Sequence, residues 1–341
     1  MLELAPQRST AMKAGALPGS AIGSVAVALP ERAVPNAAIA ERLGVDEHWI
    51  ETRTGVRSRH VAGEGERLHH LATRAGAEAL RDAGVDAAEV DLIVVATMSH
   101  DELTPAASAL VAAELGAVRA GAVDLNAACS GFVTGLATAA AQIESRRAET
   151  VLVIGADILS RLLDRDDRST AGLFGDGAGA AVMRAVPAAG RVGPVVLGAD
   201  GARGDLVRAG REEGVIRMNG HDTFRQAVDR LSESTLQALV AAETGIDEID
   251  LFVYHQANSR IIGAVGERLG LPGERVVDCM AEHGNTSAAS IPIALAHARA
   301  EGLLQDGSIA LLAAFGGGLT WAATVVEWGL PEYGSETDGS A

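Results

Sequence analysis

The chain has 341 residues, of which 45 are acidic and 28 are lysine or arginine, so its formal net charge is −17. This excess of negative charge argues against general binding to nucleic acid or to anionic membranes. Hydrophobic residues make up 48% of the chain but aromatic residues only 3%, which indicates a large core of small and aliphatic side chains. The sequence has neither a run of about eighteen apolar residues nor a signal-peptide pattern, so we expect a cytoplasmic protein that does not enter membranes.

Short apolar runs alternate with helical patterns through most of the chain. The runs, several of them continuously apolar as in buried parallel sheets, predict strands at 22–29, 91–97, 121–125, 151–156, 178–184, 193–199, 250–254, 309–315 and 321–328. The helical patterns, which end at glycine or a turn signal, lie at 67–83, 104–115, 130–144, 221–243, 258–269 and 287–301. This alternation is typical of a layered α/β fold.

Four segments fit neither pattern. Residues 1–20 and 332–341 are rich in small and turn-forming residues, so we expect a flexible N-terminal extension and a flexible tail. Residues 31–66 and 157–173 interrupt the alternation and are expected to be insertions over a cleft.

The chain contains two copies of one pattern. VDAAEVDLIVV at 85–95 returns as IDEIDLFVY at 246–254, and each copy continues to Leu-Gly, at 115–116 and 269–270. Each then reaches an elbow of small residues, AACSGF around Cys129 and HGNTSAAS around Asn285. We therefore expect two similar halves, 21–186 and 187–331, related by a pseudo-twofold axis that brings the two elbows together.

Cys129 is the candidate nucleophile of the first half. It follows a strand pattern and should lie in the first turn of an apolar helix, where the helix dipole and unpaired N–H groups favour a thiolate and lower the pKa from about 8.5. The alternative is a small buried hydrophobic residue. Cys279, in the other half, forms no CxxC pattern with it, so we expect a reducing compartment and no disulfide.

His255 and Asn285 are the polar candidates of the second half. His255 ends the run LFVY, so its ring should project from the carboxyl end of a strand, where α/β sheets usually bind ligands. Asn285 precedes an apolar helix and is either an N-cap or a hydrogen-bond donor into a cleft. The repeat favours the cleft, because it places Asn285 opposite Cys129.

Two glycine stretches, at 175–179 and 316–318, run into apolar strands rather than into helices, which disfavours a nucleotide site. Glycine does allow a backbone N–H to point at a developing oxyanion. The remaining histidines show no metal-ligand spacing, so we expect no metal site.

Five motifs in register carry a family resemblance: AACSGF, FGDGAGAAV, HQAN, GNTSAAS and FGGGLTW. In this order they resemble β-ketoacyl-[acyl carrier protein] synthase III, a thiolase-fold condensing enzyme, over about residues 20–330. The resemblance implies a homodimer of duplicated α-β-α-β-α subunits with Cys129, His255 and Asn285 as the catalytic triad. It also implies an oxyanion hole at Cys129 and Gly317, substrate or coenzyme A contacts at Trp49, Arg53, Thr104, Arg168, Phe174 and Asn258, and carrier-protein docking at Arg225 and Arg260.

The implied chemistry needs no metal or redox cofactor. Cys129 takes an acyl group from acyl-CoA, and malonyl-acyl carrier protein, or malonyl-CoA, then loses carbon dioxide to give an enolate that attacks the acyl-cysteine. Such condensation would initiate fatty-acid synthesis or prime a polyketide.

Two features depart from the family pattern, one at residues 267–268 and one at Thr104. Glu267 and Arg268 stand where related enzymes often carry two basic residues, which changes the surface offered to a carrier. Thr104 replaces a bulky aromatic residue that, in the family, reaches from the partner subunit and limits the acyl pocket, so we expect room for a longer, branched or cyclic starter.

Two other functions use the same fold. The acyl group can pass to a hydroxyl or amine with His255 as base and without decarboxylation. A non-catalytic partner subunit is the other alternative. The presence of Cys129, His255 and Asn285 together favours condensation over both.

Overall fold

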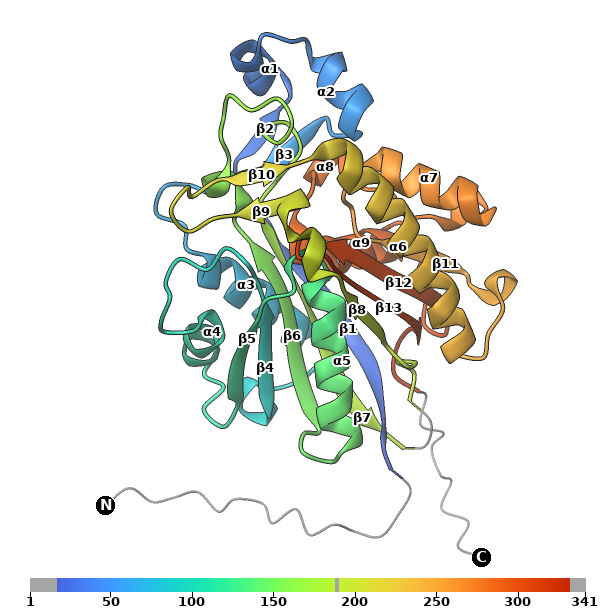
Figure 1. Ribbon diagram of the computed structural model, residues 1–341. Coiled ribbons are helices and arrows are strands. Elements are labelled where there is room, and N and C mark those ends of the chain that lie inside the picture. The colour runs from blue at the N-terminus through green and yellow to red at the C-terminus, as the bar shows by residue number, and fades with distance from the viewer. Residues whose placement is uncertain (1–16, 188–189, 332–341) are drawn as a thin grey trace, which may run out of the picture.

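The computed structural model describes residues 17–187 and 190–331 (Figure 1). Its first sheet has the order β1-β7-β6-β4-β5 and its second the order β11-β12-β13-β8. The strands of the first are β1 Gly19–Ala28, β4 Leu92–Ala96, β5 Gly121–Leu125, β6 Thr150–Asp157 and β7 Gly177–Val186. Those of the second are β8 Val196–Ala199, β11 Leu251–Tyr254, β12 Ile309–Gly316 and β13 Thr320–Glu327.

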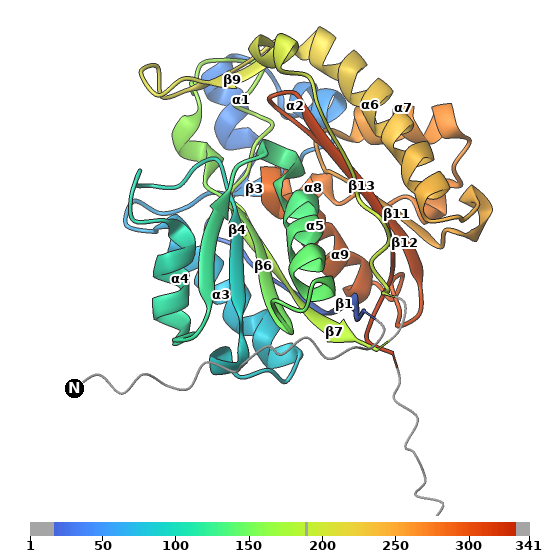
Figure 2. The ribbon, with the colours of Figure 1, turned by 60° about the horizontal axis from the view of Figure 1, so that its bottom comes forward.

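Five layers result from how the helices cover these sheets. Helices α3 (Leu68–Asp82) and α4 (Ala107–Leu115) cover the outer face of the first sheet, and α6 (Gly220–Ala241) and α7 (Ser259–Leu269) cover the outer face of the second. Between the sheets lie α5 (Gly131–Glu144) and α9 (Ser290–Ala300), as Figure 2 shows. This arrangement confirms the predicted α-β-α-β-α fold.

Small residues allow the middle layer to be thin. A Cβ atom on Gly135 of α5 would come within 2.9 Å of a Val153 methyl group on β6, and one on Gly131 would come within 3.0 Å of the Ala96 side chain. Every residue of β6 is buried, as expected of a central strand covered on both faces. The low aromatic content therefore serves close contact between helix and sheet.

The predicted elements are found with shifted ends. The helix predicted at 104–115 begins only at Ala107, because the Asp124 carboxylate accepts hydrogen bonds from the N–H groups of Ala107 and Ser108, both at 2.8 Å, and so sets the start of α4. The helix predicted at 287–301 starts as a 3₁₀ turn, Ser287–Ala289, and α9 begins at Ser290.

The two predicted insertions have regular structure of their own. Residues 31–66 contain β2 (Ala33–Pro35), α1 (Ala37–Leu43), α2 (Glu47–Thr54) and β3 (Ser58–His60), and β2 pairs with β3. Residues 157–173 contain a 3₁₀ turn, Leu159–Leu162. The short hairpin of β9 (Val207–Ala209) and β10 (Ile216–Met218) and the short helix α8 (Met280–His283) were not predicted.

The predicted halves, 21–186 and 187–331, stay a prediction. Residues 1–16 and 332–341 of the predicted loose ends lie outside the described residues, whereas Gly19 and Ser20 belong to β1 and pair with Val186 and Ala185. Among the described helices, none has the length and apolarity required to cross a membrane.

Candidate active site

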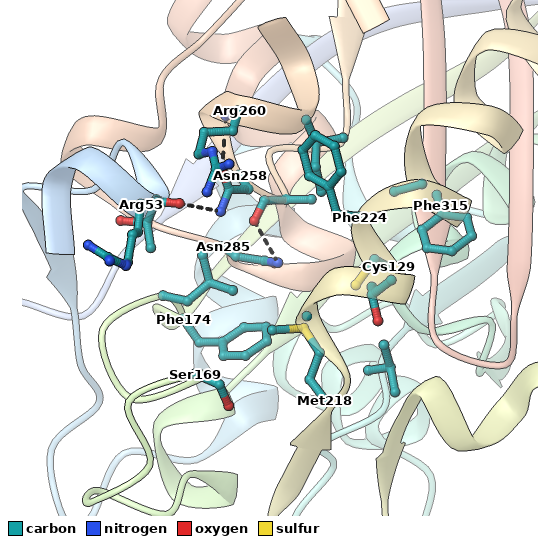
Figure 3. A pocket seen from close by; sticks show the side chains of 18 of the residues that line it. Arg53, Cys129, Ser169, Phe174, Met218, Phe224, Asn258, Arg260, Asn285 and Phe315 are labelled. Carbon is teal, nitrogen blue, oxygen red and sulfur yellow. Dashed lines mark hydrogen bonds between the residues drawn. The ribbon is translucent and has the colours of Figure 1, made fainter. Parts of the chain in front are cut away.

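A pocket of about 810 Å³ lies where segments from both ends of the described chain meet. Cys129, His255, Asn285 and Gly317 all line it. Figure 3 shows Cys129, Asn285 and Phe315 around the same hollow. The remaining lining residues are Trp49, Arg53, Thr54, Arg168, Ser169, Leu173, Phe174, Val207, Met218, Gly220, His221, Thr223, Phe224, Arg225, Ala227, Ala257, Asn258, Arg260, Ile261 and Gly316.

Cys129 lies in a 3₁₀ turn, Ala128–Ser130, between β5 and α5. Ala128 has a left-handed backbone with φ of 46°, which marks a sharp turn at the elbow. The end of β12 packs directly against it, because a Cβ atom on Gly316 would come within 2.7 Å of the Cys129 backbone nitrogen. Only glycine allows this approach.

The thiol of Cys129 is held in its protonated form. Burial raises its pKa to about 12, the Ser287 hydroxyl opposes that shift and the nearby Asp157 carboxylate adds to it. This upward shift is opposite to the predicted lowering of the pKa. Cys129 lies two residues before the start of α5 and is only partly exposed, and the loss of water around a thiolate outweighs the helix dipole here.

His255 follows β11, as predicted, and its backbone N–H donates to the Ala313 carbonyl at 2.8 Å. Burial lowers the pKa of its imidazole to about 3, so the ring is neutral at physiological pH. Its Nδ1 lies 2.5 Å from Oγ of Ser290. That hydroxyl oxygen already accepts the Gln256 N–H at 3.3 Å, so its hydrogen is free to be donated to Nδ1.

Donation from the Ser290 hydroxyl in this contact would select one tautomer of His255. A neutral ring that accepts at Nδ1 carries its hydrogen on Nε2. Ser290 was not predicted as a site residue, although it is the last residue of the HGNTSAAS motif. The start of an apolar helix after that motif was the only signal that could have found it.

Asn285 is not the N-cap of a helix, because Thr286 precedes the 3₁₀ turn and Ala289 precedes α9. Its side chain supports that turn and also lines the pocket. Its Oδ1 accepts the Ser287 N–H at 2.9 Å, while Nδ2 faces the Ala257 carbonyl at 3.4 Å. Its backbone is held by hydrogen bonds with Leu173 and Gly175. Because the side-chain oxygen is engaged with the turn, the amide NH₂ group is the part that can donate into the pocket.

Basic and aromatic residues line the outer part of the pocket. The Arg53 guanidinium lies 4.2 Å from the centre of the Trp49 ring, and the Arg53 carbonyl accepts a hydrogen bond from Asn258 Nδ2 at 2.9 Å. Arg168 donates to the Leu43 carbonyl at 2.9 Å. Arg260 lies over the Phe224 ring, with its guanidinium carbon 5.8 Å from the ring centre.

Of the predicted site residues, only Thr104 lies outside this pocket, on an exposed segment before α4. Trp49, Arg53, Arg168, Phe174, Arg225, Asn258 and Arg260 all line it. The prediction missed the contribution of Val207 and Met218, because the strands of the β9-β10 hairpin are too short to show periodicity.

Two groups of possible metal ligands occur elsewhere in the described chain. His69, His70 and Glu114 form one, and His100, Asp101 and Glu102 form the other, with ligand atoms of each group within 4.8 Å of one another. In each group a histidine ring nitrogen lies within 4 Å of a carboxylate oxygen, of Glu114 in the first and of Glu102 in the second. Neither includes a pocket residue.

Comparisons with known proteins all match one family of enzymes. Residues 239–328 match the family model of the 3-oxoacyl-[acyl-carrier-protein (ACP)] synthase III C terminal, and residues 123–201 match that of 3-oxoacyl-[acyl-carrier-protein (ACP)] synthase III. A β-ketoacyl-[acyl-carrier-protein] synthase III from Rhodospirillum rubrum is 47% identical over 310 residues, which cover 87% of this chain and 96% of that protein.

Solved structures agree with the sequence comparison. The 3-oxoacyl-[acyl-carrier-protein] synthase III from Aquifex aeolicus VF5 matches with a TM-score of 0.88 and 40% identity, covering 91% of this chain and 100% of the other. The priming β-ketosynthase from the R1128 polyketide biosynthetic pathway matches with a TM-score of 0.89 and 37% identity, covering 94% and 99%.

Proposed function

The chain belongs to the β-ketoacyl-[acyl-carrier-protein] synthase III family of acyl-condensing enzymes, and we propose that it transfers an acyl group from acyl-CoA to Cys129 and condenses it with malonyl-acyl carrier protein. The observation that supports these roles is the meeting of Cys129, His255 and Asn285 on the walls of one pocket. A thiol nucleophile and two neutral hydrogen-bond donors are the groups that this reaction needs.

In the first step, Sγ of Cys129 attacks the thioester carbon of acyl-CoA. The carbon–sulfur bond to coenzyme A breaks, and the proton of the Cys129 thiol ends on the departing sulfur. The N–H groups of Cys129 and Gly317 stabilise the oxyanion of the tetrahedral intermediate. Because burial keeps the thiol protonated, proton loss accompanies the attack rather than preceding it.

In the second step, the malonyl thioester loses its carboxylate as carbon dioxide. The electrons of the broken carbon–carbon bond form an enolate, whose oxygen accepts hydrogen bonds from His255 Nε2 and Asn285 Nδ2. The enolate carbon attacks the acyl-cysteine, the bond to Cys129 breaks, and the released thiolate takes a proton from solvent. A neutral His255 suits this role, because it donates a hydrogen bond without first losing a proton.

This reaction balances without a metal or redox cofactor, and we propose none. Loss of carbon dioxide drives carbon–carbon bond formation, and no atom changes its oxidation state through an external electron carrier. The pocket residues need only bind, polarise and exclude water.

The outer part of the pocket suits an anionic substrate arm. We propose that Trp49, Arg53, Arg168 and Asn258 bind coenzyme A or the pantetheine of the carrier, with Phe174 against the substrate. Arg225 and Arg260 then meet the acidic carrier protein. Within the described part of the chain, the pocket lining includes arginines but no aspartate or glutamate, although the chain has a net charge of −17. Local positive charge of this kind steers an acidic partner.

The open edge of the first sheet supports a homodimer. Strand β5 pairs with β4 on one side only, and its Val123 side chain is 42% exposed. Leu103 and Val118, in the connections before and after α4, are 82% and 85% exposed. Exposed strand edges with apolar side chains favour pairing, and we propose that two copies join here, which would bring Thr104 to the partner subunit's pocket.

Two biosynthetic roles fit this activity, initiation of fatty-acid synthesis and priming of a polyketide. The relatives include both a β-ketoacyl-[acyl-carrier-protein] synthase III and a priming β-ketosynthase. Acyl transfer to a hydroxyl or amine is the competing reaction, and Asn285 in the pocket favours condensation over it.

Intact-mass analysis tests the proposal. The protein is incubated with a panel of acyl-CoA thioesters, and malonyl-carrier or malonyl-CoA is then added. We expect one acyl group per wild-type chain, lost when the malonyl thioester is added, and no label on Cys129→Ala. Cys279→Ser is the matched control and should label as the wild type does. Full labelling of Cys129→Ala would refute the nucleophile, and release of the acyl group only to an alcohol or amine would refute condensation.

A further inference from the structure

Asp157 is a carboxylate buried behind the pocket, and the reaction above does not use it. It ends β6 and is 0% exposed. Its Oδ1 accepts the Thr97 hydroxyl at 3.1 Å, the Met98 N–H at 3.0 Å and the Ser99 hydroxyl at 2.7 Å. Its Oδ2 accepts the Ala288 N–H at 3.2 Å. One side chain therefore joins the segment after β4 to a turn that lies 131 residues beyond Asp157 itself.

The turn that Asp157 binds is the turn that holds Asn285. Ser287, next to Ala288, donates its N–H to Asn285 Oδ1 at 2.9 Å. Ser287 has a left-handed backbone with φ of 53°, a conformation that neighbouring contacts must maintain in a residue with a side chain. Asp157 provides such a contact at the next residue.

Strand β6 and this turn are also in direct backbone contact. A Cβ atom on Gly155 would come within 2.2 Å of the Ala288 carbonyl oxygen. The turn therefore rests on the strand at Gly155 and is tied to it at Asp157. Its position, and with it the direction of the Asn285 amide, depends on the end of β6.

We propose that Asp157 is a positioning residue for condensation, which aims the Asn285 amide at the enolate oxygen by holding the 287–289 turn. The inference rests on the proposed function. It assigns a role to a residue that neither lines the pocket nor contacts substrate.

The charge of Asp157 distinguishes this role from a purely structural one. The four donors named above are neutral groups, so none of them cancels the charge of an ionised Asp157, which helps to raise the pKa of Cys129. Burial raises the pKa of Asp157 itself, and its hydrogen bonds oppose that shift. Asp157→Asn removes the negative charge and replaces one carboxylate oxygen with an amide NH₂ group. Where that group replaces Oδ2, it faces the Ala288 N–H, so two donors oppose each other. The substitution should therefore ease formation of the Cys129 thiolate while it releases the Asn285 turn.

The test compares the two half-reactions and the thiol. In Asp157→Asn we expect acyl-enzyme formation within about threefold of the wild type and single-turnover condensation at least about tenfold slower. Alkylation of Cys129 by iodoacetamide at pH 8 should be about threefold faster, since half a pKa unit changes the thiolate fraction threefold. Asp91→Asn is the control: this carboxylate accepts the N–H groups of Glu149 and Thr150 at the opposite end of β6 and should leave the ratio of the two half-reactions unchanged.

A double variant shows whether Asp157 acts through Asn285. Condensation by Asn285→Ala should be as slow with Asp157→Asn as without it, because the amide to be positioned is already missing. If the fold-losses in condensation rate of the two single variants multiplied in the double variant, the proposal would be overturned. The proposal would also be overturned if Asp157→Asn kept the wild-type ratio of acyl-enzyme formation to condensation. The same holds if the rates of both half-reactions and of Cys129 alkylation all fell together.

If Asp157→Asn does not fold, the double variant Thr97→Val/Ser99→Ala weakens the same carboxylate from its other side, and a wild-type ratio there overturns the proposal. Failure of the proposed function looks different, because the wild type itself would then form no acyl-enzyme or would not condense it.

Discussion

The hydroxyl of Ser290 and Nδ1 of His255 are 2.5 Å apart, and both groups are buried. Since the Ser290 oxygen also accepts the Gln256 N–H, we expect the hydroxyl hydrogen to point to the ring, which keeps the ring hydrogen on Nε2. Ser290→Ala removes that restraint and lets the ring carry its hydrogen on Nδ1 instead. We expect condensation to slow by about tenfold, the size of a lost buried hydrogen bond, with acyl-enzyme formation less affected.

Stopped-flow or quenched single-turnover assays with preformed acyl-enzyme measure this effect. Ser234→Ala is the matched control, because Ser234 is equally buried but lies on α6 and bonds only to the Leu231 carbonyl in its own helix. Equal condensation rates in Ser290→Ala and wild type would show that the tautomer is set by another contact.

The raised pKa of Cys129 predicts the pH dependence of its reactivity. With a pKa near 12, the thiolate fraction rises about tenfold for each pH unit over the working range. The rate of Cys129 alkylation by iodoacetamide, followed by peptide mass spectrometry, should therefore climb without a plateau from pH 7 to pH 10.

Cys279 serves as the internal comparison for that experiment. Burial raises its pKa to about 12 as well, and it is largely shielded from solvent, so it should react more slowly than Cys129 at every pH. A plateau in the Cys129 profile near pH 7 would mean that the helix dipole outweighs burial in solution.

The position of Cys129 was predicted correctly, whereas its pKa was not. This contrast shows which properties a sequence can predict. The strand, the elbow and the following helix are local patterns, so the place of Cys129 at the end of β5 was predictable. Its pKa was not, because the burial that raises it comes partly from Gly316, whose contact with the Cys129 backbone joins residues far apart in the chain. The internal repeat was the one long-range signal available, and it correctly placed the Cys129 and Asn285 elbows together.

The same distinction between local patterns and long-range contacts applies to the second half of the chain. His255 ends a clear apolar run, and its position follows from the strand alone. Its partner Ser290 lies 35 residues away, and Asp157 meets Ala288 across 131 residues. Pairings of this kind depend on how β6, β11 and α9 pack against one another, which periodicity does not specify.

The charge at the pocket mouth predicts how a carrier protein binds. Arg260 lies on the pocket wall at the start of α7, whereas Arg268, at the other end of the same helix, forms an ion pair with Asp229. Arg260→Ala should raise KM for malonyl-carrier about five- to tenfold while the KM for malonyl-CoA changes less, because only the carrier brings an acidic protein surface.

Steady-state assays at two salt concentrations test this interpretation. The difference between wild type and Arg260→Ala should shrink as salt rises. Arg268→Ala is the control, and its effect should be smaller, since Asp229 already neutralises that arginine. An equal rise for both thioesters would instead place Arg260 at the shared pantetheine arm.

The last prediction concerns Thr104, which lies on an exposed segment and outside the pocket of its own chain. In the proposed dimer it reaches the partner subunit's pocket and limits the acyl group there. Thr104→Phe inserts a ring into that space, and overpacking commonly costs about 1–3 kcal/mol. The preference for long over acetyl starters should then fall about ten- to a hundredfold, since about 1.4 kcal/mol is tenfold. The ratio of kcat/KM for a long and a short acyl-CoA measures it, and Thr104→Val, of nearly equal volume, should keep the wild-type ratio. An unchanged ratio in Thr104→Phe would place Thr104 away from any acyl pocket, whereas equal losses for both starters, together with dissociation of the dimer, would locate the residue at the subunit contact alone.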